Sequence, residues 1–217
     1  YEDLVRVLGS RGYSVFAYDL RGHGESEGRR GDVDRFDVHL EDLDVAWAET
    51  GRVLPGKARF LYGHSMGGFL ALRLGAHPSG WWKARLAGVI VESPVTSYPL
   101  VIERTMPRSL RFTMPWIRWI LRREHERIHP DLPVRYATAA IPHMGLPTVP
   151  VLGLQALEDR TLGLAHFEQL SEALAEHRTP CELHVIKGHF HSTEKDTETR
   201  KQLVEEWLQP NQKGVLL

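Results

Sequence analysis

The sequence predicts an α/β fold with a mostly parallel sheet and helices on both of its faces. Short, nearly continuous apolar runs alternate with segments of helical periodicity, as in sheets that are covered on both sides. One apolar run leads through a glycine-flanked serine into a helix, and two later runs lead into loops that carry acidic and histidine side chains. With 217 residues, 42% of them hydrophobic, the chain has the size and composition of one globular domain.

Charge and cysteine content exclude several classes of protein. The net charge of −1 gives no reason to expect a nucleic-acid partner. A single cysteine, Cys181, rules out an internal disulfide, and no histidine or cysteine spacing indicates a metal site. No apolar run approaches the ~18 residues of a membrane-spanning helix. We expect no metal and no cofactor, a cytoplasmic location, and Cys181 as an inert core residue at the start of a buried strand.

The elements follow one another in a regular order. The chain begins with a helix that presents Leu4, Val7 and Leu8 on one face and ends near Gly12. Helical spacing also predicts helices over 37–50, after Ser65, over about 163–177 and before Pro210. Strands are expected at 13–20, 58–63, 86–93, 149–157 and 181–188.

Residues 94–148 interrupt this alternation. The segment is rich in proline and shows no clear strand. We therefore expect a helical cap over the carboxyl edge of the sheet, inserted between the two parts of the core, 1–93 and 149–217. The histidines of the segment, His125, His129 and His143, are expected to be surface or cap residues.

The stretch FLYGHSMGGFLAL, residues 60–72, places Ser65 between a strand and a helix. A plain turn is the simplest interpretation, but this context is typical of a nucleophile elbow, a sharp turn that exposes a serine above a sheet. We expect Gly63 and Gly67 to be crowded by backbone where a Cβ would clash. Gly68 would let the helix begin close to the sheet.

A serine nucleophile needs a base and a carboxylate that orients the base. The segment LQALEDRTL follows one predicted strand and offers Glu158 and Asp159. The segment VIKGHFHS follows the last strand and offers His189 and His191. Serine, acid and histidine follow one another in this order in folds that are built around a nucleophile elbow. Parallel sheets bind ligands at the loops that follow their strands.

The chain resembles the α/β-hydrolases of the serine hydrolase group (S33 type) that includes monoacylglycerol lipases and bacterial lysophospholipases. GYSVFAYDLRGHGES, GHSMGG, VPVLGLQALEDRTL and KGHFHSTEKDTETRKQLVEEWL carry the resemblance. It implies Ser65 as the nucleophile, Asp159 as the acid, His191 as the base with His189 as its rival, and the Met66 backbone N–H as an oxyanion donor. It further implies hydrolysis of a monoacylglycerol or lysophospholipid ester without a cofactor. Acyl transfer, amide hydrolysis, peroxidation and a non-catalytic binding role remain alternatives on this scaffold.

The resemblance also implies that strands are absent. The five expected strands match the last five of an eight-stranded family sheet, whose third strand lies between the fourth and the fifth. We therefore expect a gap in the sheet with unpaired backbone on both sides. We also expect that the chain is a fragment of a longer protein, which supplies the second oxyanion donor.

The cap segment 104–127 combines aromatic and cationic residues. It contains seven arginines together with Trp116 and Trp119. These tryptophans could pack the cap on the core, or they could line an acyl-chain entrance or touch a lipid surface. The second interpretation predicts a lipid substrate and peripheral membrane contact through the cap.

Overall fold

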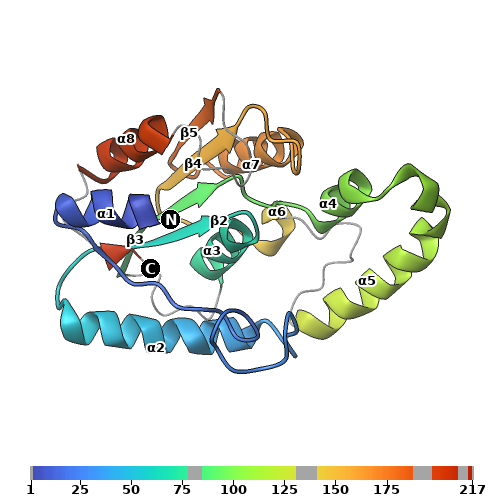
Figure 1. The fold of residues 1–217 in the computed structure, drawn as a ribbon, viewed down its shortest axis with the longest axis horizontal. Helices are drawn as coiled ribbons and strands as arrows, with labels where there is room; N and C mark the ends of the chain where they lie inside the picture. The colour runs from blue at the N-terminus through green and yellow to red at the C-terminus, as the bar shows by residue number, and fades with distance from the viewer. Residues whose placement is uncertain (1, 78–84, 131–140, 188–196, 210–214, 217) are drawn as a thin grey trace.

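The computed structural model describes residues 2–77, 85–130, 141–187, 197–209 and 215–216, which form one sheet with helices on both faces (Figure 1). The predicted α/β class is confirmed, and every strand pair within the described residues is parallel. The strands are β1 (Ser14–Val15), β2 (Arg59–His64), β3 (Leu86–Glu92), β4 (Val151–Ala156), β5 (Cys181–Ile186) and β6 (Val215–Leu216), in the spatial order β1-β6-β2-β3-β4-β5.

Two layers of helices cover this sheet. The helices are α1 (Glu2–Ser10), α2 (Asp37–Val53), α3 (Met66–Ala76), α4 (Tyr98–Thr105), η2 (Arg108–Thr113, a 3₁₀ helix), α5 (Met114–Ile128), α6 (Ile141–Met144), α7 (Ala165–Glu176) and α8 (Thr197–Leu208). Helices α1 and α8 bury Leu8 and Trp207 on one face. Helices α2, α3 and α7 bury Trp47, Phe69 and Leu170 on the other. No helix in the described residues is long and apolar enough to cross a membrane.

The centre of the sheet is β2-β3-β4. Val89, Ile90, Val151 and Leu152 have no exposed surface, because helices cover both sides of these strands. Strand β5 lies at the edge, and Cys181 at its start is exposed. The expectation of a buried Cys181 was therefore wrong: an apolar run shows that a strand exists but not where the strand lies in the sheet.

The amino-terminal side of the sheet differs from the expectation. Only two residues of the expected strand 13–20 form β1, and β6, which the sequence did not predict, lies between β1 and β2. Strand β6 pairs with only two residues on each side, so it fills part of the expected gap. Beside it remains an apolar cavity of about 270 Å³, whose lining includes Leu8, Phe16, Leu61, Leu70 and Leu74.

The cap elements α4, η2 and α5 extend beyond the carboxyl edge of the sheet (Figure 1). Both ends of the segment 94–148 nevertheless belong to the core, since Val95, Ile141 and Met144 are buried in the main apolar cluster. The Ile141 N–H donates to the Thr96 carbonyl at 2.8 Å, which joins these two ends. The cap that projects from the core is thus shorter than the whole segment 94–148.

Candidate active site

Ser65 occupies a strained turn between β2 and α3. Its φ of 56° and ψ of −118° lie in a region that a residue with a Cβ rarely adopts. Three backbone hydrogen bonds hold it there: the Ser65 N–H donates to the Glu92 carbonyl at 2.9 Å, and the Ser65 carbonyl accepts from Val95 and Phe69 at 3.1 and 3.2 Å. A strained serine between a buried strand and a helix is the geometry of a nucleophile elbow.

The glycines of the elbow differ in their roles. A Cβ on Gly63 would lie 2.1 Å from the Gly67 carbonyl oxygen, so no other residue fits without moving the turn. A Cβ on Gly68 would lie 2.9 Å from Pro94 Cβ, which agrees with a close approach of helix and sheet. A Cβ on Gly67 would meet nothing within 4 Å. The expectation for Gly67 was therefore wrong, because its missing side chain points into open space.

Asp159 is buried after the end of β4. Its Oδ1 accepts hydrogen bonds from the backbone N–H groups of Thr161 and Leu162, each at 2.9 Å. Its Oδ2 accepts from the Gln155 amide Nε2 at 3.2 Å. These donors fix the carboxylate at the sheet edge, whereas the neighbouring Glu158 is exposed. The sequence analysis did not identify Gln155 as a site residue. The only feature that could have indicated its role is its position as a polar residue inside the apolar run VLGLQA.

The two candidate bases, His189 and His191, lie outside the described residues. The described chain leaves β5 at the carboxyl edge of the sheet, where Ser65 and Asp159 also stand. One strand, β3, separates the strands that carry Ser65 and Asp159, which corresponds to about 10 Å across the sheet. The structure thus brings the predicted nucleophile and acid to one edge.

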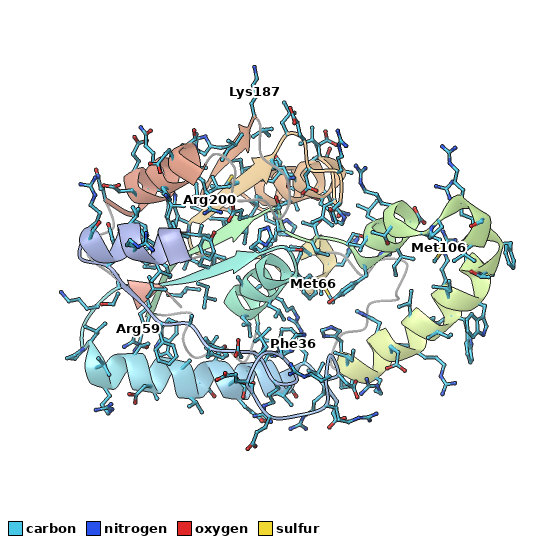
Figure 2. All side chains as sticks on the ribbon, viewed as in Figure 1. Phe36, Arg59, Met66, Met106, Lys187 and Arg200 are labelled. Carbon is cyan, nitrogen blue, oxygen red and sulfur yellow. The ribbon has the colours of Figure 1, made fainter. Side chains whose placement is uncertain are left out.

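Met66 is the first residue of α3, and the label in Figure 2 places it at this end of the helix. The first N–H groups of a helix have no intrahelical partner, and the helix dipole adds positive charge there. The Met66 N–H is therefore suited to stabilise an oxyanion that forms on a substrate attacked by Ser65.

A polar network lies beneath the elbow. The Tyr62 hydroxyl donates to the Glu92 carboxylate at 2.5 Å, and Arg200 Nη1 donates to the same carboxylate at 3.2 Å. The side chains of Glu92 and Arg200 are only 13% and 14% exposed. Arg200 lies in the first half of α8, shown above the sheet in Figure 2. The network joins α8 to the two strands on which the elbow is built.

A cavity of about 350 Å³ lies between the cap and the core, next to Met66. Apolar side chains dominate its lining. From the core come Phe69 and Leu70, and from the cap come Tyr98, Ile102, Leu121 and Ile128. Trp116 and Trp119 do not belong to this lining and are 64% and 53% exposed. The structure therefore does not bring the two tryptophans to the site.

One side of this cavity carries histidines around Phe36, which lies just before α2 (Figure 2). The His39, His77 and His129 rings lie 5.6, 6.1 and 5.2 Å from the Phe36 ring, and His125 lies 4.9 Å from His129. All four histidines are buried. His125 and His129 are thus cap residues, one of the two expected positions, but they are buried and not on the surface, because the end of α5 faces the core.

Burial lowers the pKa of His39, and nearby Asp42 opposes that effect. Within the described part of the chain, no group of three histidine, cysteine, aspartate or glutamate side chains could hold a metal ion. The ring contacts of His39, His125 and His129 around Phe36 pack the cap against the core.

Comparison with known proteins agrees with this fold. The Hydrolase_4 family model, described as serine aminopeptidase S33, matches residues 1–142. The human monoglyceride lipase is 39% identical over 95 residues, which is 44% of this chain and 30% of that protein. The Bacillus subtilis phospholipase YtpA is 30% identical over 110 residues, 49% of this chain and 39% of that protein. These alignments span well under half the length of either relative.

A solved structure extends the comparison over nearly the whole chain. The monoacylglycerol lipase of Paleococcus ferrophilus superposes with a TM-score of 0.66 at 22% identity. The superposition covers 98% of this chain and 89% of that one. At this identity the likeness establishes the fold.

Proposed function

Because this chain belongs to the serine aminopeptidase S33 family of α/β-hydrolases, we propose that it hydrolyses a carboxylic ester through Ser65, Asp159 and His191. The observation that carries the proposal is the strained Ser65 at the start of α3, beside an apolar cavity. Holding a serine in this backbone conformation costs folding free energy. Such strain is typical of a nucleophile elbow, whereas a plain turn does not require it.

The proposed reaction proceeds through an acyl-enzyme. His191 accepts the Ser65 hydroxyl proton while the serine oxygen attacks the ester carbonyl carbon. The resulting oxyanion is stabilised by the Met66 N–H. His191 then gives its proton to the leaving alcohol. His191 then deprotonates a water molecule, which attacks the acyl carbonyl carbon. The bond between the acyl group and Ser65 breaks, the fatty acid leaves, and His191 returns the proton to the Ser65 oxygen. Asp159 orients His191 and stabilises its cation throughout.

The proposed substrate is a monoacylglycerol or a lysophospholipid. The cavity next to Met66 is lined mainly by apolar side chains, which suits an acyl chain better than a polar substrate. The names of the relatives, a monoglyceride lipase and a phospholipase, support an ester of this class.

The test is intact mass after treatment with a fluorophosphonate probe. We expect one adduct on the wild-type protein and none on Ser65→Ala. His191→Ala should slow labelling strongly, whereas the matched variant His189→Ala should not. Absence of an adduct on the folded wild type would overturn the nucleophile assignment and favour a binding protein.

Product analysis separates the remaining chemistries. With a long-chain monoacylglycerol as substrate we expect free fatty acid, also when an alcohol acceptor is added. Accumulation of a new ester would show acyl transfer instead. Release of amine from an acyl amide, with the ester left intact, would show an amidase.

A further inference from the structure

The cap carries a cluster of exposed aromatic side chains that the proposed function does not use. We define the outer cap face as Leu110, Phe112, Trp116 and Trp119, which are 45%, 78%, 64% and 53% exposed. Among the described residues, every exposed tryptophan or phenylalanine lies on this face. Large aromatic side chains gathered in one exposed patch indicate a binding surface.

Helical geometry separates the outer cap face from the cavity. Trp116 and Trp119 are three residues apart in α5, so they share one side of that helix. Phe112 lies in the 3₁₀ helix η2 that directly precedes α5. Leu121 and Ile128, which line the cavity, lie on the opposite side at 100° per residue. The cap thus covers the cavity with its inner side, and its outer side is not needed for packing on the core.

Positive charge surrounds the aromatic side chains. Residues 108–128 contain six arginines and only two acidic residues. In the part of the chain that the structure describes, Arg108, Arg111 and Arg123 are exposed and form no ion pair with a carboxylate. The Arg123 guanidinium lies 5.1 Å from the centre of the Trp119 ring. The outer cap face, with exposed aromatic side chains and arginines, therefore suits a partner that has an apolar interior and a negatively charged surface.

We propose that the outer cap face docks the protein on the surface of an anionic phospholipid bilayer. Phe112, Trp116 and Trp119 insert at the level of the headgroups, where aromatic rings are favoured. Arg108, Arg111 and Arg123 contact lipid phosphates. The idea that docking delivers a lipid substrate to the cavity rests on the proposed function. The binding of the outer cap face to the bilayer does not depend on it.

The experiment is cosedimentation of the protein with vesicles, without substrate. Vesicles of phosphatidylcholine alone are compared with vesicles that contain phosphatidylglycerol, at about 0.1 M salt, where surface charges still act over ~10 Å. We expect binding to the anionic vesicles, weakened by higher salt. Equal binding to both kinds of vesicle, or binding to neither, would overturn the proposal.

Two variants and a control locate the surface. Trp116→Ser with Trp119→Ser, and separately Arg108→Gln with Arg111→Gln, should each weaken vesicle binding roughly tenfold or more. Val45→Ser removes a 72% exposed apolar side chain from α2 and should bind as the wild type does. Thermal unfolding of every variant checks that it is folded. If the folded tryptophan variant binds vesicles as tightly as the wild type, the docking surface is not the outer cap face.

Failure of this proposal is distinguishable from failure of the proposed function. Vesicle binding requires no reaction at Ser65, so Ser65→Ala should bind vesicles as the wild type does. Fluorophosphonate labelling is measured without lipid, so the arginine variant should be labelled at the wild-type rate.

Discussion

Gly63 and Gly67 flank the same serine but differ in the space around them. The motif treats them as equivalent, whereas in the folded chain only Gly63 faces backbone, at 2.1 Å from the Gly67 carbonyl oxygen. We expect Gly63→Ala to lower the free energy of unfolding by about 3 kcal/mol or to prevent folding, because the turn must move. Gly67→Ala should be tolerated or should stabilise by up to ~1 kcal/mol, as in other helices. Urea unfolding of both variants checks this, and equal losses would contradict it.

Gln155 is a buried side chain that donates a hydrogen bond to Asp159. It has no exposed surface. Gln155→Leu should lower the free energy of unfolding by about 2 kcal/mol, the scale of a hydrogen bond to a charged group. It should also slow fluorophosphonate labelling of Ser65 on the order of tenfold, because the acid is less well held. Gln202→Leu, which removes an exposed amide bonded to Glu206, is the matched control and should change neither quantity.

At the scale of elements, the Glu92–Arg200 pair joins strand β3 to helix α8. Both side chains are largely withdrawn from water, so removing either one breaks a poorly hydrated ion pair. Glu92→Gln or Arg200→Met alone should lower the free energy of unfolding by about 3 kcal/mol. The double variant should lose less than the sum of the two. Urea unfolding of the four proteins measures the coupling, and additive losses would show that the pair does not hold α8.

Acid should loosen the junction between the cap and α2. Burial lowers the pKa of His39 below its usual 6.5, so the folded protein takes up this proton less readily than the unfolded chain. The stability contributed by neutral His39 is present above about pH 6.5 and lost as the pH falls below it, by up to ~1.4 kcal/mol per pH unit. Urea unfolding between pH 7.5 and pH 5.5 (roughly one unit either side of that value) should show this loss, and His39→Asn should reduce it. If His39→Asn loses as much stability at pH 5.5 as the wild type does, the loss arises from other titratable groups.

At the scale of the whole molecule, stability should be uneven across the sheet. Strands β2, β3 and β4 are paired over their length, whereas β1 and β6 pair over two residues beside an apolar cavity of about 270 Å³. Hydrogen exchange should therefore be slowest for the amides of β3 and β4 and fastest for residues 14–20. Uniform protection across these strands would contradict this gradient.

Local patterns determined much of this protein. Apolar runs predicted the four long strands β2 to β5, whereas only two residues of the expected strand 13–20 form β1. Glycine spacing with a strand before and a helix after predicted the turn at Ser65. Chain order offered Glu158 and Asp159, of which the family resemblance implied Asp159. These features depend on near neighbours in sequence, so sequence carries them directly. The roles of His189 and His191 stay predictions, because both lie outside the described residues.

Only tertiary structure decided which side chains meet. It placed β5 at the edge and so exposed Cys181, set β6 between β1 and β2, and brought Gln155 against Asp159. It also turned His125 toward the core while leaving Trp116 in solvent, although both lie on one amphipathic helix. Strand order and the facing of a helix arise from contacts between segments far apart in sequence, and periodicity alone does not specify which face of a helix finds a partner.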